Sequence, residues 1–134
     1  MTLTPYIMFN GTCEEALNFY AKALNGKITD LNRFEGSPAE GMSADTQKVM
    51  HATFVAGDLT LMASDGAEAE AAGGMVDLSL NFTDGSEIAK TFEALSEGAR
   101  VTMPLQDTFW GATFGMLTDK FGVNWMFNHD KEQP

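Results

Sequence analysis

The chain is poor in cysteine, histidine and long apolar runs. Its 134 residues contain one cysteine, Cys13, and two histidines, His51 and His129. A single cysteine excludes an internal disulfide and any zinc site built from several cysteines, and it favours a reducing, cytoplasmic location. No apolar run approaches the roughly 20 residues that a membrane span needs, and the N-terminus lacks the pattern of a signal peptide. We therefore expect no membrane partner.

Basic residues are also few. The chain has 8 Lys and Arg against 19 Asp and Glu, which gives a net charge of −11, and the basic residues are scattered rather than grouped. Such a field repels phosphate backbones and anionic lipids, so nucleic-acid binding is not expected. Hydrophobic residues make up 44% of the chain. This share excludes a disordered chain and is sufficient for a buried core.

The first half of the sequence predicts one strand, one helix and three further strands. Residues 12–26 have the helical spacing of apolar side chains. Thr12 and Glu15 form a capping-box pattern at the start, and Asn25-Gly26 is a stop signal in which the glycine takes the left-handed conformation. The strands are expected at residues 6–9, 27–34, 48–55 and 59–63.

The second half repeats this pattern at a shift of 72 residues, so that residues 84–98 match residues 12–26. In the strand before this helix, Val76 and Leu78 alternate with Asp77 and Ser79, which predicts one buried and one polar face. We interpret the match as a degenerate internal repeat. The strands are expected at residues 75–82, 99–103, 112–118 and 123–128.

Both halves therefore predict a β-α-β-β-β module, and the fold class is α+β. We expect a single domain over residues 1–134, with one module over residues 1–63 and the other over residues 75–130. The small, acidic, Gly/Ala-rich residues 64–74 are expected to form the linker.

Several residue runs resemble those of one protein family. The longest is Gln106-Asp107-Thr108-Phe109-Trp110-Gly111, and shorter runs are Pro5-Tyr6-Ile7, His51-Ala52, Met62-Ala63-Ser64-Asp65 and Phe121-Gly122-Val123 with Trp125. With these runs the chain resembles the PhnB-like branch of the vicinal-oxygen-chelate superfamily, which includes glyoxalase I, bleomycin-resistance proteins and extradiol dioxygenases. The resemblance implies two βαβββ modules whose mixed and antiparallel sheets form a curved cup. It also implies a homodimer.

In metal-dependent members of that superfamily, four His, Gln or Glu side chains hold one metal ion. The resemblance places these positions at Pro5, Leu61, Asp77 and Met126. Of the four, Asp77 alone has a side chain that binds hard metals, and one carboxylate does not hold Zn²⁺, Ni²⁺ or Fe²⁺. We therefore expect no metal. We also expect no cofactor, because the sequence has no G-x-G-x-x-G or Walker loop. This absence argues against the methyltransferase label that the branch often carries from the ubiquinone pathway.

His51 and Asp77 are the candidate catalytic residues. Strand alternation places His51 and Thr53 opposite Ala52 and Phe54, so that His51 faces the cup as a general base or a ligand hydrogen-bond partner. The alternative is a histidine satisfied by a neighbouring strand or loop. Asp77 meets His51 or a ligand cation in one interpretation and is a solvated rim residue in the other.

Phe109 and Trp110 are candidate walls of a ligand pocket, with a plug over the edge of the cup as the alternative. Gln106, Thr53 and Ser79 are candidate polar contacts to the ligand. Among the remaining residues of interest, Trp125 is expected to pack under a helix, Cys13 to be buried and His129 to be exposed.

Three functions stay open from the sequence. The first, which the metal positions favour, is a metal-free module that binds a small, partly apolar molecule. The second is an enzyme, either a metal-dependent lyase, isomerase or oxygenase with ligands in a shifted register, or an acid–base enzyme built around His51 and Asp77. The third is a domain kept for assembly, which the polar residues of the cup disfavour.

Overall fold

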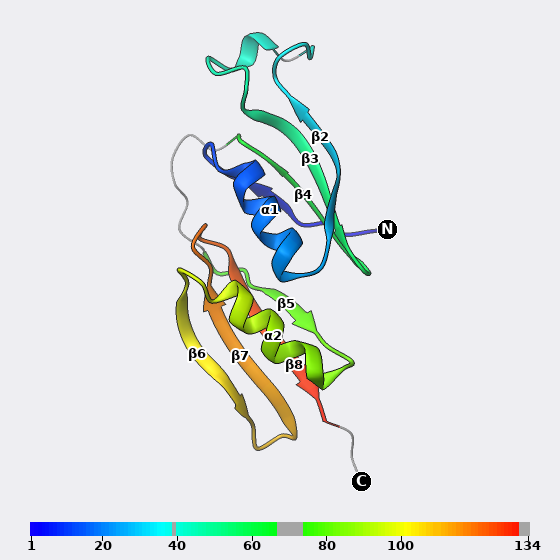
Figure 1. The fold of residues 1–134 in the computed structure, drawn as a ribbon, viewed down its shortest axis with the longest axis vertical. Coiled ribbons are helices and arrows are strands. Elements are labelled where there is room, and N and C mark those ends of the chain that lie inside the picture. The colour runs from blue at the N-terminus through cyan, green and yellow to red at the C-terminus, as the bar shows by residue number, and fades with distance from the viewer. Residues whose placement is uncertain (39, 67–73, 132–134) are drawn as a thin grey trace. The chain divides into compact units, whose positions relative to one another are not determined.

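The computed structural model describes residues 1–38, 40–66 and 74–131. The chain divides into two compact units, Met1–Ala71 and Ala72–Pro134 (Figure 1). The first unit contains β1 (Tyr6–Met8), α1 (Cys13–Ala23), β2 (Lys27–Arg33), the 3-10 helix η1 (Glu40–Met42), β3 (Val49–Ala56) and β4 (Leu59–Ser64). The second unit contains β5 (Leu78–Asn81), α2 (Gly85–Leu95), β6 (Arg100–Asp107), β7 (Ala112–Thr118) and β8 (Asn124–Asp130). The predicted α+β class and the two β-α-β-β-β modules are confirmed.

The two units share one sheet topology. The strand order is β1-β4-β3-β2 in the first sheet and β5-β8-β7-β6 in the second. In each sheet the module's first and last strands pair in parallel, and the other neighbours pair antiparallel. The bounds of α1 and α2 are related by the same shift of 72 residues that the sequence shows. The internal repeat is therefore present both in the positions of the helices and in the pairing of the strands.

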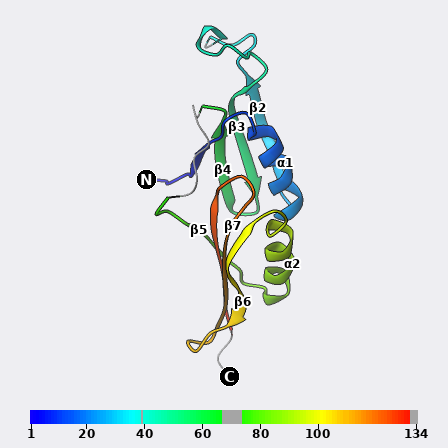
Figure 2. The ribbon, with the colours of Figure 1, turned by 90° about the vertical axis from the view of Figure 1, so that its left-hand side faces the viewer.

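In the first unit, α1 packs against one face of the sheet (Figure 2). Its buried residues, Cys13, Ala16, Leu17 and Tyr20, recur at helical spacing. The Tyr20 ring meets the Phe54 ring of β3 edge-on, with 6.5 Å between ring centroids. Ala52, Phe54, Leu61 and Ala63 are fully buried. These alternate residues of β3 and β4 therefore face α1.

In the second unit, α2 covers one face of its sheet (Figure 2). Phe92 of α2 meets Phe127 of β8 edge-on, with 5.0 Å between ring centroids. Leu117, Trp125 and Phe127 are buried. Because Trp125 and Phe127 share a face of β8, Trp125 lies on the α2 side, as predicted.

A buried carboxylate fixes the turn between β7 and β8. Asp119 Oδ1 accepts hydrogen bonds from the backbone N–H groups of Phe121 and Val123, at 2.9 and 3.0 Å. Its Oδ2 accepts a third from Trp125 Nε1 at 2.9 Å. These contacts give the run from Asp119 to Trp125 a structural role.

The start of α1 differs from the predicted capping box. Thr12 precedes the helix, but its side chain caps no N–H group. The first helical N–H, that of Cys13, donates to Asp65 Oδ1 at 2.9 Å, and Asp65 Oδ2 accepts from the backbone N–H of Val49 at 3.0 Å. A buried carboxylate from the end of β4 therefore takes the place of the local cap.

The end of α1 also differs. Asn25, with φ 53°, takes the left-handed conformation, and Gly26 does not. Gly26 is required for another reason, because a Cβ there would approach Phe54 Cζ and the Val55 carbonyl oxygen to 2.6 Å. The glycine lets the chain enter β2 against the end of β3.

Three predicted boundaries are wrong in the described residues. β5 begins at Leu78 rather than at residue 75, and β6 continues to Asp107, so that Gln106 lies in a strand rather than in a loop. The predicted linker 64–74 begins too early, because Ser64 ends β4 and Asp65 is buried. Its residues 67–73 lie outside the described residues. No described helix is long and apolar enough to span a membrane.

Candidate functional site

Each sheet has one face toward its own helix and one face turned away from it, which we call the distal face (Figure 2). Alternation from the buried residues and cross-strand pairing assign its members. The distal face of the first sheet includes Tyr6, Met8, Asp30, Asn32, His51, Thr53 and Met62. The distal face of the second includes Ser79, Asn81, Met103, Gln106, Phe114, Met116, Met126 and Asn128.

His51 lies on the distal face of the first sheet, the face that alternation predicts. Its Nδ1 is 3.2 Å from the hydroxyl oxygen of Tyr6, and the two ring centroids are 5.7 Å apart. Its Nε2 has no hydrogen-bond partner among the residues that the structure describes. Tyr6 was not predicted as a site residue; the parallel pairing of β1 with β4 brings it near His51.

The surroundings of His51 on this face are polar. Thr53 follows it on the same side of β3 and lies between Met62 of β4 and Asp30 of β2 in the strand register. Asn32 is the β2 partner of His51, and its Nδ2 donates to Asp30 Oδ1 at 3.1 Å. The first distal face therefore holds an imidazole, a phenol, a hydroxyl and an amide–carboxylate pair.

Phe109, Trp110 and Gln106 come together in the second unit. Trp110 meets Phe109 edge-on at 5.0 Å and Phe114 at 6.1 Å between ring centroids. Gln106 is the cross-strand partner of Phe114. Phe109 is 97% exposed and Trp110 54%. Large aromatic surface is thus presented to solvent beside the second distal face.

The hairpin between β6 and β7 that carries this aromatic pair is anchored on both sides. Thr108 Oγ1 donates to the Ala112 carbonyl and accepts from the Ala112 N–H, each at 3.1 Å. Lys131 Nζ lies 2.8 Å from Asp107 Oδ1. The hydrogen bond and the charge of Lys131 hold the pKa of Asp107 below its ordinary value. The tip is therefore a built turn rather than a loose loop.

Ser79 is at one end of a row of methionines. It is the partner of Met126, which pairs with Met116, which in turn pairs with Met103. Thioether side chains adapt to ligands of irregular shape. The methionines make this part of the second distal face apolar, and Ser79 places a hydroxyl at the end of the row.

Asp77 precedes β5 and is exposed, and Val76 beside it is 70% exposed. The prediction that Val76 lies on a buried strand face is therefore wrong. The Asp77 side chain forms no hydrogen bond or ion pair with a described residue of its own unit. His51 and Asp77 belong to different units, and their joint catalytic role stays a prediction.

The four positions expected to correspond to metal ligands do not fit a hard metal ion. Leu61 is fully buried on the α1 side, whereas its neighbour Met62 is on the distal face opposite Tyr6. The register in β4 is therefore displaced by one residue, and the new position also lacks a hard donor. Within the described ranges, no group of three or more His, Cys, Asp or Glu side chains is placed to hold a metal.

A cavity of about 480 Å³ lies in the first unit where β2 and β3 enter their connecting loop. Its lining includes Leu31, Asn32, Arg33, Glu35, Pro38 and Met50. Asn32 links this cavity to the first distal face, since it is also the partner of His51. None of the predicted site residues lines it.

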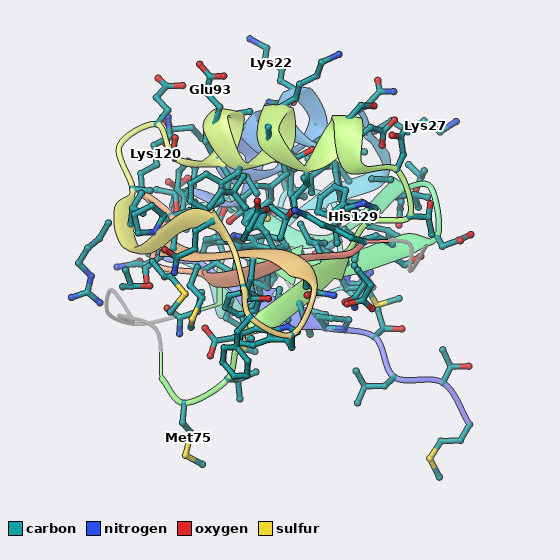
Figure 3. The ribbon with its side chains drawn as sticks, turned by 90° about the horizontal axis from the view of Figure 1, so that it is seen from below. Lys22, Lys27, Met75, Glu93, Lys120 and His129 are labelled. Atoms are coloured by element: carbon teal, nitrogen blue, oxygen red, sulfur yellow. The ribbon has the colours of Figure 1, made fainter. Side chains whose placement is uncertain are left out.

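Neither His129 nor Cys13 is exposed. His129 is half-buried in β8 beneath α2, and its Nδ1–H donates to the Phe82 carbonyl at 2.9 Å, so the expected exposure is wrong (Figure 3). A Cβ on Gly85 would come within 2.7 Å of the His129 Nε2.

Cys13 is buried, and burial together with the Asp65 and Glu14 charges raises its pKa to about 12. Cys13 is thus the inert thiol that the sequence predicts.

Comparison with known proteins gives a consistent family. A family model described as 3-demethylubiquinone-9 3-methyltransferase matches residues 1–127. The YjdN protein of Escherichia coli K12 is 30% identical over 145 residues, covering 100% of this chain and 99% of the relative.

Solved structures agree with this result. Protein PA1353 from Pseudomonas aeruginosa is 41% identical, with a TM-score of 0.87 over 98% of this chain and 99% of the other. A PhnB protein from Bacillus cereus is 26% identical, with a TM-score of 0.79 over 96% and 99%. A glyoxalase-related enzyme from Fulvimarina pelagi, 14% identical over 97% and 89%, has a TM-score of 0.66 and shares the fold.

Proposed function

This chain belongs to the PhnB-like family described as 3-demethylubiquinone-9 3-methyltransferase, and from that premise we propose that it binds a small, planar, partly apolar molecule without a catalytic metal. The observation that carries the proposal is the aromatic hairpin beside the second distal face. Phe109 and Trp110 expose apolar surface on an anchored turn, and such surface is typical of binding sites. Trp110 packs against Phe114, which extends the surface onto the sheet.

The residues around the hairpin support this ligand chemistry. Aromatic rings favour a planar partner, and the methionine row of the second distal face adapts to its outline. Gln106 and Ser79 supply hydrogen bonds at two places on the same face. Because the chain carries a net charge of −11, a neutral or cationic molecule approaches more readily than a polyanion.

A methyltransferase activity has less support from the residues. The sequence contains no G-x-G-x-x-G or Walker loop to hold a nucleoside-bearing cofactor. A shared fold hosts many activities, so the family description does not by itself assign one. In this proposal the protein works without a cofactor. It acts in the cytoplasm and as a homodimer.

Tryptophan fluorescence tests the proposal, because the two tryptophans differ in exposure. Trp110 is 54% exposed and Trp125 is fully buried. In a screen of planar metabolites, a ligand should quench the wild-type emission, and Trp110→Phe should remove the response while keeping the Trp125 signal. Trp110→Ala should weaken binding several-fold, whereas Leu3→Ala, which changes another exposed apolar residue, should not. Equal affinities for wild type and Trp110→Ala would contradict the proposal.

A metal-free acid–base enzyme is the second candidate, favoured by the contact between Tyr6 and His51. An imidazole placed beside a bound ligand can serve as a general acid or base. If the ligand is also converted, His51→Gln should abolish conversion while ligand binding is kept. Conversion at the wild-type rate would reject this candidate.

A further inference from the structure

The hydrogen bond between Tyr6 and His51 limits where the imidazole carries its proton. One hydrogen lies between the Tyr6 oxygen and His51 Nδ1, which are 3.2 Å apart. When His51 is neutral, either the phenol O–H donates to Nδ1, or Nδ1–H donates to the phenol oxygen. In the first arrangement the imidazole hydrogen is on Nε2. In the other arrangement Nε2 carries no hydrogen and is an acceptor.

Two observations favour the phenol as donor. The lone pairs of a phenol oxygen are partly delocalised into the ring, so the oxygen is a good donor and a weak acceptor. No other protein acceptor for the Tyr6 O–H, and no donor toward Nε2, occurs among the described residues. The arrangement with Nδ1–H would therefore leave both the phenol hydrogen and the Nε2 lone pair without a protein partner.

We propose that Tyr6 is a positioning residue that donates its O–H to Nδ1 and holds neutral His51 in the Nε2–H tautomer. Neutral His51 then offers an N–H donor from Nε2 on the first distal face. The Thr53 hydroxyl lies on the same side of β3, while the Asn32 amide N–H is directed to Asp30. This set suits a ligand with a neutral oxygen acceptor, such as a carbonyl.

The proposal rests on the proposed binding function for its ligand class, but its test needs no ligand. Nitrogen-15 NMR of the whole chain labelled at histidine distinguishes a protonated ring nitrogen from an unprotonated one. The chain has two histidines, and His51→Gln assigns the signals by removing one set. His129 is an internal reference, because its Nδ1 donates to the Phe82 carbonyl and must carry hydrogen.

At a pH at which both rings are neutral, we expect His129 to be protonated at Nδ1 and His51 at Nε2. In Tyr6→Phe, the His51 signals should move toward a mixture of both tautomers, while the His129 signals stay in place and report an intact second unit. The proposal is overturned if wild-type His51 carries its hydrogen on Nδ1, or if Tyr6→Phe leaves the tautomer unchanged. The wild-type spectrum decides the tautomer even if the variant does not fold. A failed metabolite screen would count against the proposed function alone.

Discussion

At the scale of single residues, burial decides the chemistry of Cys13. Its pKa is raised to about 12, first by burial and then by the charges of Asp65 and Glu14. A native thiol with this pKa has almost no thiolate at pH 8, so it should resist alkylation. We expect iodoacetamide to modify Cys13 only after denaturant unfolds the chain, as measured by mass spectrometry. Rapid modification of the native protein would contradict the buried position.

The same pKa shift predicts a pH dependence of stability. Because the folded pKa lies above the ordinary value of 9.0, the unfolded chain releases this proton first as the pH rises. The contribution of Cys13 is therefore fully present below about pH 9 and is lost as the pH rises toward 12. The free energy of unfolding of wild type should fall more steeply between pH 8.5 and 10.5 than that of Cys13→Ala. Parallel curves from urea titrations would contradict the prediction.

The two tryptophans should differ in their effect on stability. Trp125 is fully buried and donates to Asp119, whereas Trp110 is 54% exposed on the hairpin. Trp125→Ala should lower the free energy of unfolding by about 3–5 kcal/mol, because it leaves a cavity in the core. Trp110→Ala should have a smaller effect. A larger loss for Trp110→Ala in denaturant titrations would show that the hairpin ring belongs to the core.

At the scale of elements, the contact between Asp65 and the start of α1 gives a prediction. Both carboxylate oxygens accept backbone N–H groups, one from Cys13 and one from Val49. Asp65→Asn should lower the free energy of unfolding by about 1–3 kcal/mol, since an amide can accept one of these bonds but not both. The control is Asp58→Asn, at an exposed turn. Equal stability of the two variants would remove this role for Asp65.

Element positions were predictable where the signal is local. Apolar spacing placed α1 and α2, and β7 has the bounds expected from its alternation. β5 is shorter than expected because alternation continues through Val76, whereas pairing with β8 begins at Leu78. β6 is longer because irregular pairing lets it continue past Met103 to Asp107. Pairing between distant strands decides these ends, and no local pattern contains it.

The candidate site also has a part that local patterns predict and a part that depends on the pairing of distant strands. Alternation alone placed His51 and Thr53 on the distal face, because Ala52 and Phe54 are plainly apolar. The contact between His51 and Tyr6 joins residues 45 positions apart, and it depends on the parallel pairing of β1 with β4. Predicting it requires the strand register, which a single sequence does not supply.

At the scale of the whole molecule, the two units use one topology for two kinds of surface. His51 and Phe114 occupy equivalent positions in their sheets. Each is followed by a buried residue, and that residue pairs with a buried residue in the last strand of its module. Their β2 and β6 partners are Asn32 and Gln106, so both are amides. The repeat has therefore kept an amide beside each position while exchanging an imidazole for a phenyl ring. At this position the first distal face is therefore polar and the second is aromatic.

The last prediction concerns assembly. β2 and β6 end their sheets, and exposed sheet edges are usually covered by another element or another chain. We therefore expect a homodimer, with a mass by light scattering near twice the 14.5 kDa of one chain. Two copies with a net charge of −11 repel each other, so salt, which screens charges beyond about 10 Å at 0.1 M, should raise the dimer fraction at low protein concentration. A mass that stays near 14.5 kDa at every protein and salt concentration would refute the prediction.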